Sequence, residues 1–320
     1  MMDKELERRA ALVSRAIEQF LPVVHPRGLY EAGRHLVDSG GKRLRPSMLL
    51  LAAEAVGGDA ATLAPAAVSI ELIHNFTLIH DDIMDNADVR RGRAAVHKLW
   101  GVSGAILAGD TLYSKAFQAL GMTPARPELI LGAMNVLSGT CTAICEGQWL
   151  DIEFEKRQSV SEDEYMEMIE KKTGVLYGAS ASMGALLAGA PDRVVKGLEE
   201  FGRLTGMGFQ LQDDVLDLTA PESVLGKRRG GDLVEGKKTM IMIHAMSRGI
   251  DVDVFGRKDA TIEQIERAIT VLERSGSIEY ARSRAWDMVE AGKKALDVLP
   301  DSPAKVMLND LADYMIRRRY

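Results

Sequence analysis

Apolar residues recur every three or four positions along most of this chain, and prolines or glycines separate the segments that show this spacing. The spacing predicts α-helices, because it places the apolar side chains on one helix face. Proline cannot continue a helix interior and glycine favours helix ends, so these residues predict the boundaries. The predicted boundaries lie at Pro22 and Pro26, Gly40 and Gly41, Pro46, residues 57–59, Pro65, Pro124 and Pro127, and Pro191, Pro221, Pro300 and Pro303.

Strand signals are scarce in this chain. Alternation of polar and apolar residues is hard to find, and neither Asn-Gly nor Asp-Gly, the usual hairpin turns, occurs. One further helix is expected to begin at Val102 and to end before Pro124. We therefore predict an all-α fold: a single domain over residues 1–320, in which ten or more helices surround a central cavity.

Composition narrows the class of protein. The chain is 46% hydrophobic and only 5% aromatic, and its formal net charge is −6. This balance argues against a general nucleic-acid binder, since no basic stripe interleaved with aromatic residues is present. Residues 1–9 mix charges and do not form a signal peptide, and the weakly polar run at residues 175–191 is too short for a membrane span. We expect a cytoplasmic protein.

The two cysteines are four positions apart, at Cys141 and Cys145. This spacing offers half of a metal site, but no second pair of Cys or His residues completes it. We therefore expect two thiols buried in the core of a protein from a reducing compartment.

Two aspartate clusters have the same spelling, D-D-x-x-D, at residues 81–85 and 213–217. In each cluster the first and last aspartates lie one turn apart on the same face of a helix. Carboxylates placed in this way repel one another unless a cation lies between them. Oxygen ligands without cysteine favour Mg²⁺, which prefers a few carboxylates together with substrate phosphates.

The helix faces that carry the aspartates hold further polar residues. His74 lies seven positions before Asp81 on the first face, and Gln210 lies three positions before Asp213 on the second. A row of buried carboxylates is costly unless the protein uses it. This cost is the strongest argument from the residues for an active site here.

Three basic clusters accompany the aspartates, at residues 41–46, 171–174 and 226–239. Pro46 is expected at the first position of a helix, so that backbone N–H groups and the cations before it converge on an anion. Residues 171–174 repeat this arrangement before the next helix. The third cluster is rich in glycine and predicts a mobile loop that closes over a phosphate. Together these features describe a cage for a metal-bound diphosphate.

The chain resembles the trans-isoprenyl diphosphate synthases, the farnesyl and geranylgeranyl diphosphate synthase group, and is most similar to the archaeal geranylgeranyl type. The resemblance runs from about Gly40 to Thr239 in a set of motifs that occur in family order. These motifs are G-K-R-x-R-P, D-D-x-x-D-x-x-x-x-R-R-G, G-D-x-L, G-Q-x-L-D, K-T-G, F-Q-x-x-D-D-x-x-D and G-x-D-x-x-x-x-K.

The resemblance implies a homodimeric, all-α enzyme that uses three Mg²⁺ ions. In this family an allylic diphosphate loses its diphosphate to give a carbocation, which the double bond of isopentenyl diphosphate attacks. Loss of a proton then leaves a trans-prenyl chain longer by one five-carbon unit. Nucleic acids have no part in this reaction, and the partners are small diphosphates and a second copy of the chain.

The resemblance also implies the roles of individual residues. The metal ligands are Asp81, Asp82, Asp85, Asp213 and Asp217, with Asp214 nearby. The residues expected to hold the allylic diphosphate are Arg90, Lys172, Lys227 and Lys237. The residues expected to hold isopentenyl diphosphate are Lys42, Arg45, His74 and Arg91. The residues expected to stabilise the carbocation are Thr173 and Gln210. The basic tail, Arg317 to Arg319, either folds over the isopentenyl site or is solvated.

Product length is expected to depend on Phe76 and Thr77, which lie five and four positions before Asp81. At 1.5 Å per residue they are roughly 6–8 Å along the helix from the metals. A large ring there would form the floor of the cavity into which the product grows. The pair Phe76-Thr77 resembles the archaeal geranylgeranyl type, which predicts a twenty-carbon product, with farnesyl diphosphate as an intermediate or co-product.

Three alternatives stay open. A farnesyl diphosphate synthase would have the same chemistry and a shorter product. A class I terpene cyclase also uses a D-D-x-x-D face, but it needs no second substrate and lines its pocket with aromatic residues, which are scarce here. A non-catalytic synthase subunit usually lacks one aspartate cluster, whereas this chain has both.

Overall fold

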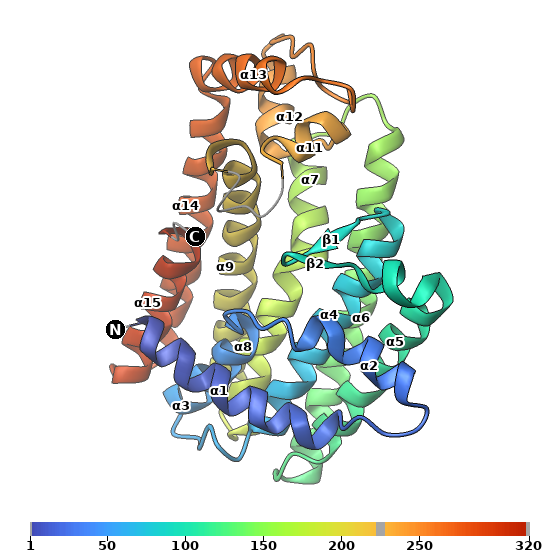
Figure 1. Ribbon diagram of the computed structural model, residues 1–320. Helices are drawn as coiled ribbons and strands as arrows, with labels where there is room; N and C mark the ends of the chain where they lie inside the picture. The colour runs from blue at the N-terminus through green and yellow to red at the C-terminus, as the bar shows by residue number, and fades with distance from the viewer. Residues whose placement is uncertain (1, 222–227, 318–320) are drawn as a thin grey trace. The chain divides into compact units, whose positions relative to one another are not determined.

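The computed structural model describes residues 2–221 and 228–317, and its secondary structure is almost entirely helical (Figure 1). The helices up to the middle of the chain are α1 Met2–Phe20, α2 Arg27–Val37, α3 Leu44–Ala55, α4 Ala64–Met84, α5 Val96–Gly121, α6 Pro127–Lys156, α7 Glu162–Ile169, the π-helical η1 Glu170–Gly174 and α8 Val175–Leu187. Those that follow are α9 Asp192–Thr219, α11 Gly231–Glu235, α12 Met240–Ser247, α13 Ile262–Arg274, α14 Ser277–Ala295, the 3-10 turn η2 Leu296–Val298 and α15 Pro303–Arg317. The prediction of an all-α bundle with ten or more helices is confirmed.

Most helix boundaries lie where prolines and glycines predicted them, with two corrections. Pro46 is the third residue of α3 rather than its first, because the helix already begins at Leu44. The segment expected from Val102 begins earlier, at Val96. Gly101 has φ 70° and ψ 167°, so it interrupts the helix and regular geometry resumes at Val102. Capping boxes at Ser161 and Thr261 satisfy the first N–H groups of α7 and α13.

One small hairpin was not predicted. Strand β1, Val89–Arg90, pairs with β2, Arg93–Ala94, in antiparallel register. The turn uses Arg91 at φ 52° and Gly92 at φ 72°, and neither an Asn-Gly nor an Asp-Gly pair signals it.

Contacts between Cα atoms divide the chain into two compact units. The first comprises Met1–Cys141, Ala179–Glu199 and Leu296–Leu311, and the second comprises Thr142–Gly178, Glu200–Ala295 and Ala312–Tyr320. The first aspartate cluster belongs to the first unit and the second cluster to the second unit. That residues 1–320 form a single domain stays a prediction.

In the first unit, α4 packs along α5 over most of its length. The close approach depends on Gly109 of α5, where a Cβ atom would lie 2.2 Å from Nε2 of His80. Residues of α4 such as Ile70, Leu72 and Ile73 are fully buried. The polar residues at the carboxyl end of α4 are therefore held by a helix that is tightly packed on its other faces.

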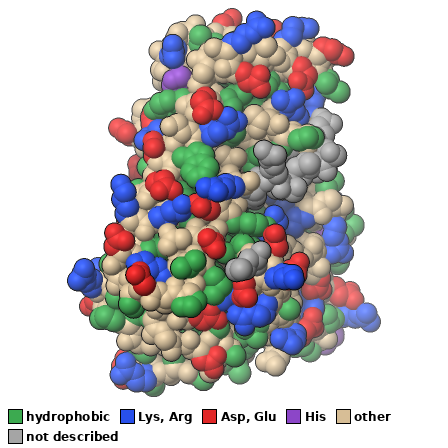
Figure 2. All heavy atoms as spheres, turned by 90° about the vertical axis from the view of Figure 1, so that its left-hand side faces the viewer, with side chains coloured by type: hydrophobic (Ala, Val, Ile, Leu, Met, Phe, Trp, Pro, Cys, Tyr) green, Lys and Arg blue, Asp and Glu red, His purple; other side chains and the backbone are tan. Residues whose placement is uncertain are grey.

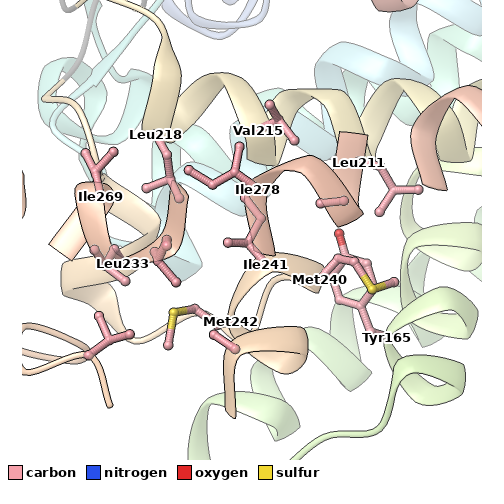
Figure 3. Close-up of a cluster of buried hydrophobic side chains, with 14 of the residues drawn as sticks. Tyr165, Leu211, Val215, Leu218, Leu233, Met240, Ile241, Met242, Ile269 and Ile278 are labelled. Carbon is pink, nitrogen blue, oxygen red and sulfur yellow. The ribbon is translucent and has the colours of Figure 1, made fainter. Parts of the chain in front are cut away.

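In the second unit, a hydrophobic cluster forms around α9, α12 and α14 (Figure 3). Figure 3 shows Tyr165 of α7 beside Met240, with its hydroxyl turned toward α9, where Leu211 and Val215 lie. The hydroxyl of Tyr165 thus lies at the edge of this cluster, beside the helix that carries the second aspartates.

Charged side chains, one cysteine and part of α6 lie at the surface. On the face that Figure 2 shows, acidic and basic side chains are interspersed and hydrophobic ones occur singly or in small groups. Cys141 is buried but Cys145 is exposed, so the prediction of two buried thiols is wrong for Cys145, which lies on the outer face of α6. Within the described residues, α6 is the one helix long and apolar enough to span a membrane, by length and composition alone.

Candidate active site

The first aspartate cluster lies at the carboxyl end of α4. Asp82 is almost completely buried, Asp81 is half-buried, and Asp85 is exposed and caps the helix. Arg90 binds one oxygen of Asp82, with Nε at 2.8 Å and Nη2 at 2.6 Å. The other oxygen, Oδ2, is buried without a hydrogen-bond partner. Burial raises the pKa of Asp82, and the positive charge of Arg90 opposes that rise.

The hairpin that follows α4 directs two arginines to different places. Arg90 points back to Asp82, whereas Nη1 of Arg91 donates to the carbonyl of Gly40 at 2.7 Å. The guanidinium of Arg91 also lies about 3.5 Å from where a Cβ atom of Gly41 would be, so a larger residue there would crowd it. The hairpin therefore joins the first aspartate cluster to the basic loop at residues 40–45.

The three cations of the basic loop differ in their exposure to solvent. Lys42 is exposed and Arg45 is half-buried, whereas Arg43 between them is buried. Nη1 of Arg45 donates to Nε2 of His74 at 3.3 Å. Lys42, Arg45, Arg91 and His74, which sequence reasoning grouped together, thus all belong to the same region of the first unit.

His74 is a neutral imidazole in this surrounding. Burial, and then the charges of four nearby arginines, hold the pKa of His74 well below its usual value. Because Nε2 accepts from Arg45, the proton of the ring is on Nδ1. An anion that binds beside His74 meets several arginines there, of which Arg43 pairs with Glu71 and Arg90 pairs with Asp82.

The second aspartate cluster lies near the carboxyl end of α9. Asp214 accepts a hydrogen bond from Nε2 of Gln210 at 3.0 Å and another from the hydroxyl of Tyr165. Gln210 in turn accepts from the hydroxyl of Thr173 at 3.0 Å. Burial, reinforced by the charge of Asp232, raises the pKa of Asp214 to about 7.

Asp213 and Asp217 differ in their surroundings. Asp213 is half-buried, whereas Asp217 is almost completely buried and accepts from the backbone N–H of Asp232 at 3.2 Å. The carbonyl of Asp217 accepts from the N–H of Gly230 at 2.9 Å. Asp217 therefore fixes the start of α11 as well as contributing a carboxylate to the cluster.

The second basic cluster corrects a prediction. Residues 171–174 were expected to precede a helix start, but they form the π-helical η1, which joins α7 to α8 without a break. No free N–H groups of a helix start are present there. Lys172 instead binds Asp151 of α6, with Nζ to Oδ2 at 2.5 Å. Single π-helical turns inside α-helices are frequent at functional sites.

The third basic cluster is only partly described. Lys227, predicted to bind the allylic diphosphate, lies outside the described residues. Arg228 donates to the carbonyl of Ala260 at 2.5 Å, and Arg229 forms an ion pair with Glu266 at 2.9 Å. Lys237 lies 3.4 Å from a carboxylate oxygen of Glu235. The glycine-rich loop predicted here therefore includes the short helix α11, and Arg228 and Arg229 serve the packing of this region.

The carboxylates suit Mg²⁺ by their chemistry. Within residues 2–221 and 228–317, no group of three or more His, Cys, Asp or Glu residues is close enough to form a metal site by itself. Asp82 nevertheless has a buried oxygen without a partner, and Asp214 has a pKa raised partly by Asp232 and Asp217. A hard cation with oxygen ligands would relieve both conditions, so the residues fit this metal.

Phe76 and Thr77 lie on α4 as predicted, and both are half-buried. The ring of Phe76 contacts that of His80 at 4.7 Å between centroids and that of Tyr113 on α5 at 5.3 Å. The hydroxyl of Thr77 donates to the carbonyl of His74. The ring of Phe76 is thus held by aromatic neighbours from both helices.

Sequence reasoning assigned no role to several residues of these networks. They are Arg43, Glu71, Asn75, Tyr165, Asp151 and Asp232. Glu71 and Asn75 could have been found from their spacing, since they lie three positions before and one position after His74. Tyr165 has no comparable signal, because its partner is 49 positions away.

Comparison with known proteins identifies relatives over the whole chain. The family model described as polyprenyl synthetase matches residues 26–272. A geranylgeranyl diphosphate synthase from Methanosarcina mazei is 57% identical over 99% of this chain and 98% of its own length. A geranylfarnesyl diphosphate synthase from Natronomonas pharaonis is 48% identical over 100% of this chain and 98% of its own. The solved geranylgeranyl pyrophosphate synthetase from Geoglobus acetivorans has a TM-score of 0.93 at 48% identity, covering 98% of this chain and 99% of its own.

Proposed function

The chain belongs to the polyprenyl synthetase family, and we propose that it is a short-chain prenyltransferase that makes geranylgeranyl diphosphate. It condenses isopentenyl diphosphate with dimethylallyl, geranyl and farnesyl diphosphates, head to tail. The observation that carries this proposal is that both carboxylate clusters are intact in a chain whose 57%-identical relative is named for this product. Farnesyl diphosphate forms on the way and is a possible co-product.

We propose that each active site binds three Mg²⁺ ions. The ligands are Asp81, Asp82, Asp85, Asp213 and Asp217, with Asp214 beside them. When bound, the ions stabilise the negative charge that develops on the diphosphate as the allylic C–O bond breaks. The buried, unpartnered oxygen of Asp82 supports this assignment.

The residues of the first unit bind isopentenyl diphosphate in this proposal. Arg45 and His74 are joined by a hydrogen bond, and Arg91 lies beside Gly40 and Gly41 at the start of the same loop. A neutral His74 can donate from Nδ1 to a phosphate oxygen while Lys42, Arg45 and Arg91 supply charge. Four arginines lie around His74 and two of them pair with Glu71 and Asp82, and this excess of positive charge supports the choice of a diphosphate anion.

The residues of the second unit act on the allylic substrate. Lys172 and Lys237, with Lys227 and Arg90, bind its diphosphate. Thr173 and Gln210 direct their oxygen dipoles at the carbocation and stabilise it without forming a bond to it. The hydrogen bond between these two side chains, and that from Gln210 to Asp214, fix their orientation and support the assignment.

Phe76 limits the product to twenty carbons in this proposal. Its contacts with His80 and Tyr113 keep the ring in one place, so the product meets a rigid obstacle. Thr77 beside it is smaller and leaves room. We predict that Phe76→Ala lengthens the product by at least one five-carbon unit, measured as the size of the dephosphorylated alcohol. A product of unchanged length would exclude Phe76 as the floor.

We propose a cytoplasmic homodimer whose contact includes α6. Six exposed, uncharged residues of α6 recur every three or four positions and form a stripe along the helix: Leu131, Asn135, Ser138, Thr142, Cys145 and Trp149. Trp149 is 71% exposed and Leu131 is 62% exposed. Extended uncharged faces with large apolar residues usually mark a contact with another protein. A second copy of this chain is the occupant that the family favours.

Product analysis tests the proposed function. The purified protein is incubated with Mg²⁺ and isopentenyl diphosphate, together with dimethylallyl, geranyl or farnesyl diphosphate in separate reactions, and the alcohols are sized after dephosphorylation. Geranylgeraniol from all three is the expected result. Farnesol alone would indicate a farnesyl synthase, and a twenty-five-carbon alcohol would place this chain with its geranylfarnesyl relative. Cyclic hydrocarbons formed without isopentenyl diphosphate, or no reaction at all, would overturn the proposal.

A further inference from the structure

Arg43 occupies an unusual position in the basic loop. It is the residue directly before α3 and has a positive φ of 47°, which residues other than glycine rarely adopt. Its neighbours Lys42 and Arg45 reach the surface, whereas the side chain of Arg43 is only 5% exposed. A charge that the protein has taken out of water must be compensated there.

Glu71 of α4 compensates this charge. Its side chain is 3% exposed and forms an ion pair with Nη1 of Arg43. Nη2 of Arg43 donates to the carbonyl of Val37, the last residue of α2, at 2.6 Å. Nδ2 of Asn75 donates to Glu71 Oε1 at 2.6 Å, so the carboxylate is held from two sides. One guanidinium therefore joins the end of α2, the start of α3 and the middle of α4.

These contacts determine the positions of Lys42 and Arg45. Residues 38–43 connect α2 to α3. Arg43 holds this connection through Glu71 and the carbonyl of Val37, and Arg91 holds it through the carbonyl of Gly40. Arg45 follows on the first turn of α3 and meets His74, which lies one turn from Glu71 on the same helix. Movement of the Arg43–Glu71 pair would shift Lys42 and Arg45 together relative to His74.

We propose that Arg43, Glu71 and Asn75 form a positioning network for the isopentenyl diphosphate site, in which none of the three touches the substrate. The proposal rests on the proposed function, because it assigns Lys42, Arg45 and His74 to that substrate. Glu71 pairs directly with Arg43, so the network aligns the loop while Lys42 and Arg45 keep their own positive charges. The allylic site, which lies in residues of the second unit and in Arg90, does not depend on it.

The test compares the KM for isopentenyl diphosphate with the KM for farnesyl diphosphate. Glu71→Gln leaves the size of the side chain unchanged but removes the charge that compensates Arg43. We expect KM for isopentenyl diphosphate to rise on the order of ten- to a hundredfold, since small misplacements of binding groups have effects of this size. KM for farnesyl diphosphate is expected to stay within about twofold of the wild-type value.

Glu54→Gln is the matched control. Glu54 forms an ion pair with Arg9, whose side chain is 2% exposed and also pairs with Glu5, so this change removes one carboxylate partner from a buried arginine in the same unit. Arg9 joins α1 to α3 at the end remote from the basic loop. Glu54→Gln is expected to lower the melting temperature but to leave both Michaelis constants unchanged.

Arg43→Lys provides a second variant in case Glu71→Gln does not fold. A lysine keeps the charge but cannot bind Glu71 and the Val37 carbonyl at once, so it should raise KM for isopentenyl diphosphate as well. Equal rises of both Michaelis constants, or the same rise in Glu54→Gln, would overturn the positioning role and leave only a structural one. Absence of condensation in the wild-type protein would instead refute the proposed function, so the two failures are distinguishable.

Discussion

Tyr165 donates its hydroxyl hydrogen to Asp214 from within the hydrophobic cluster of the second unit (Figure 3). Asp214 also receives a hydrogen bond from Gln210, so each of its two oxygens has a fixed donor. Hydrogen bonds of this kind orient a carboxylate next to a metal, and their loss typically lowers metal affinity or activity by about 10–100-fold. The orientation of the Asp214 carboxylate therefore depends on a residue that lies outside every motif of the sequence.

We predict that Tyr165→Phe raises the Mg²⁺ concentration for half-maximal activity about tenfold or more. The change removes only the hydroxyl, so the ring remains in the hydrophobic cluster, and the buried oxygen left without a donor lowers stability by about 1–3 kcal/mol. A Mg²⁺ titration of the initial rate, together with thermal unfolding, measures both effects.

Tyr280→Phe is the control for this prediction. Tyr280 donates to Glu162 at 2.6 Å in the same unit, so the same chemical change removes a bond between tyrosine and a carboxylate away from Asp214. Its Mg²⁺ dependence is expected to match the wild type. If Tyr165→Phe and Tyr280→Phe behave alike, Tyr165 has only a structural role.

The residues that the sequence identified and those it missed differ in a physical way. The aspartates and His74 became candidates because several fall on one helix face at short spacing, where burying a row of polar groups is costly unless the protein uses them. Glu71 and Tyr165 act through partners 28 and 49 positions away, which only tertiary packing brings together. Residues that hold other residues in place therefore required the structure.

At the scale of elements, the clearest failure of prediction is η1. Residues 171–174 were expected to precede a helix, like the basic cluster at residues 41–46, but they lie within a continuous helical segment and Gly174 has no positive φ. A Cβ atom there would lie 3.0 Å from Cγ of Met207, so this glycine permits close helix packing rather than a turn. The sequence alone does not distinguish these two uses of glycine.

Gly147 of α6 lies on the other side of η1. A Cβ atom at this position would lie 2.4 Å from the backbone nitrogen of Lys172, and backbone atoms cannot move aside cheaply. We predict that Gly147→Ala displaces η1, destabilises the protein by about 1–3 kcal/mol and strongly reduces turnover, because Lys172 and Thr173 move together. Steady-state kinetics and thermal unfolding test this expectation.

Gly28→Ala serves as the control for Gly147→Ala. Gly28 is in the first turn of α2, and nothing lies within 4 Å of the place of its Cβ atom. Turnover of this variant should equal that of the wild type. Normal turnover of Gly147→Ala would mean that η1 tolerates displacement and that its position is not critical for the reaction.

At the scale of the whole molecule, the sequence predicted the all-α architecture because helical spacing and proline positions agree along the chain. It did not indicate which helix presents an uncharged face to its surroundings. Residues 129–145 carry no charge at all, so charge does not distinguish the buried face of this helix from the exposed one. The exposure of Leu131 and Cys145 shows that part of this stretch is on the surface.

A charge on that stripe should therefore prevent self-association. Leu131→Glu places a carboxylate on this uncharged stripe, where contact with a second copy would desolvate it at a cost, so we predict a shift from dimer to monomer in sedimentation or light scattering. Val306→Glu on α15 is the matched control, because Val306 is 59% exposed compared with 62% for Leu131 and lies outside the stripe. It should leave the mass unchanged. If Leu131→Glu stays dimeric while the wild type is a dimer, the contact lies elsewhere on the surface; if the wild type is a monomer, the stripe has another partner.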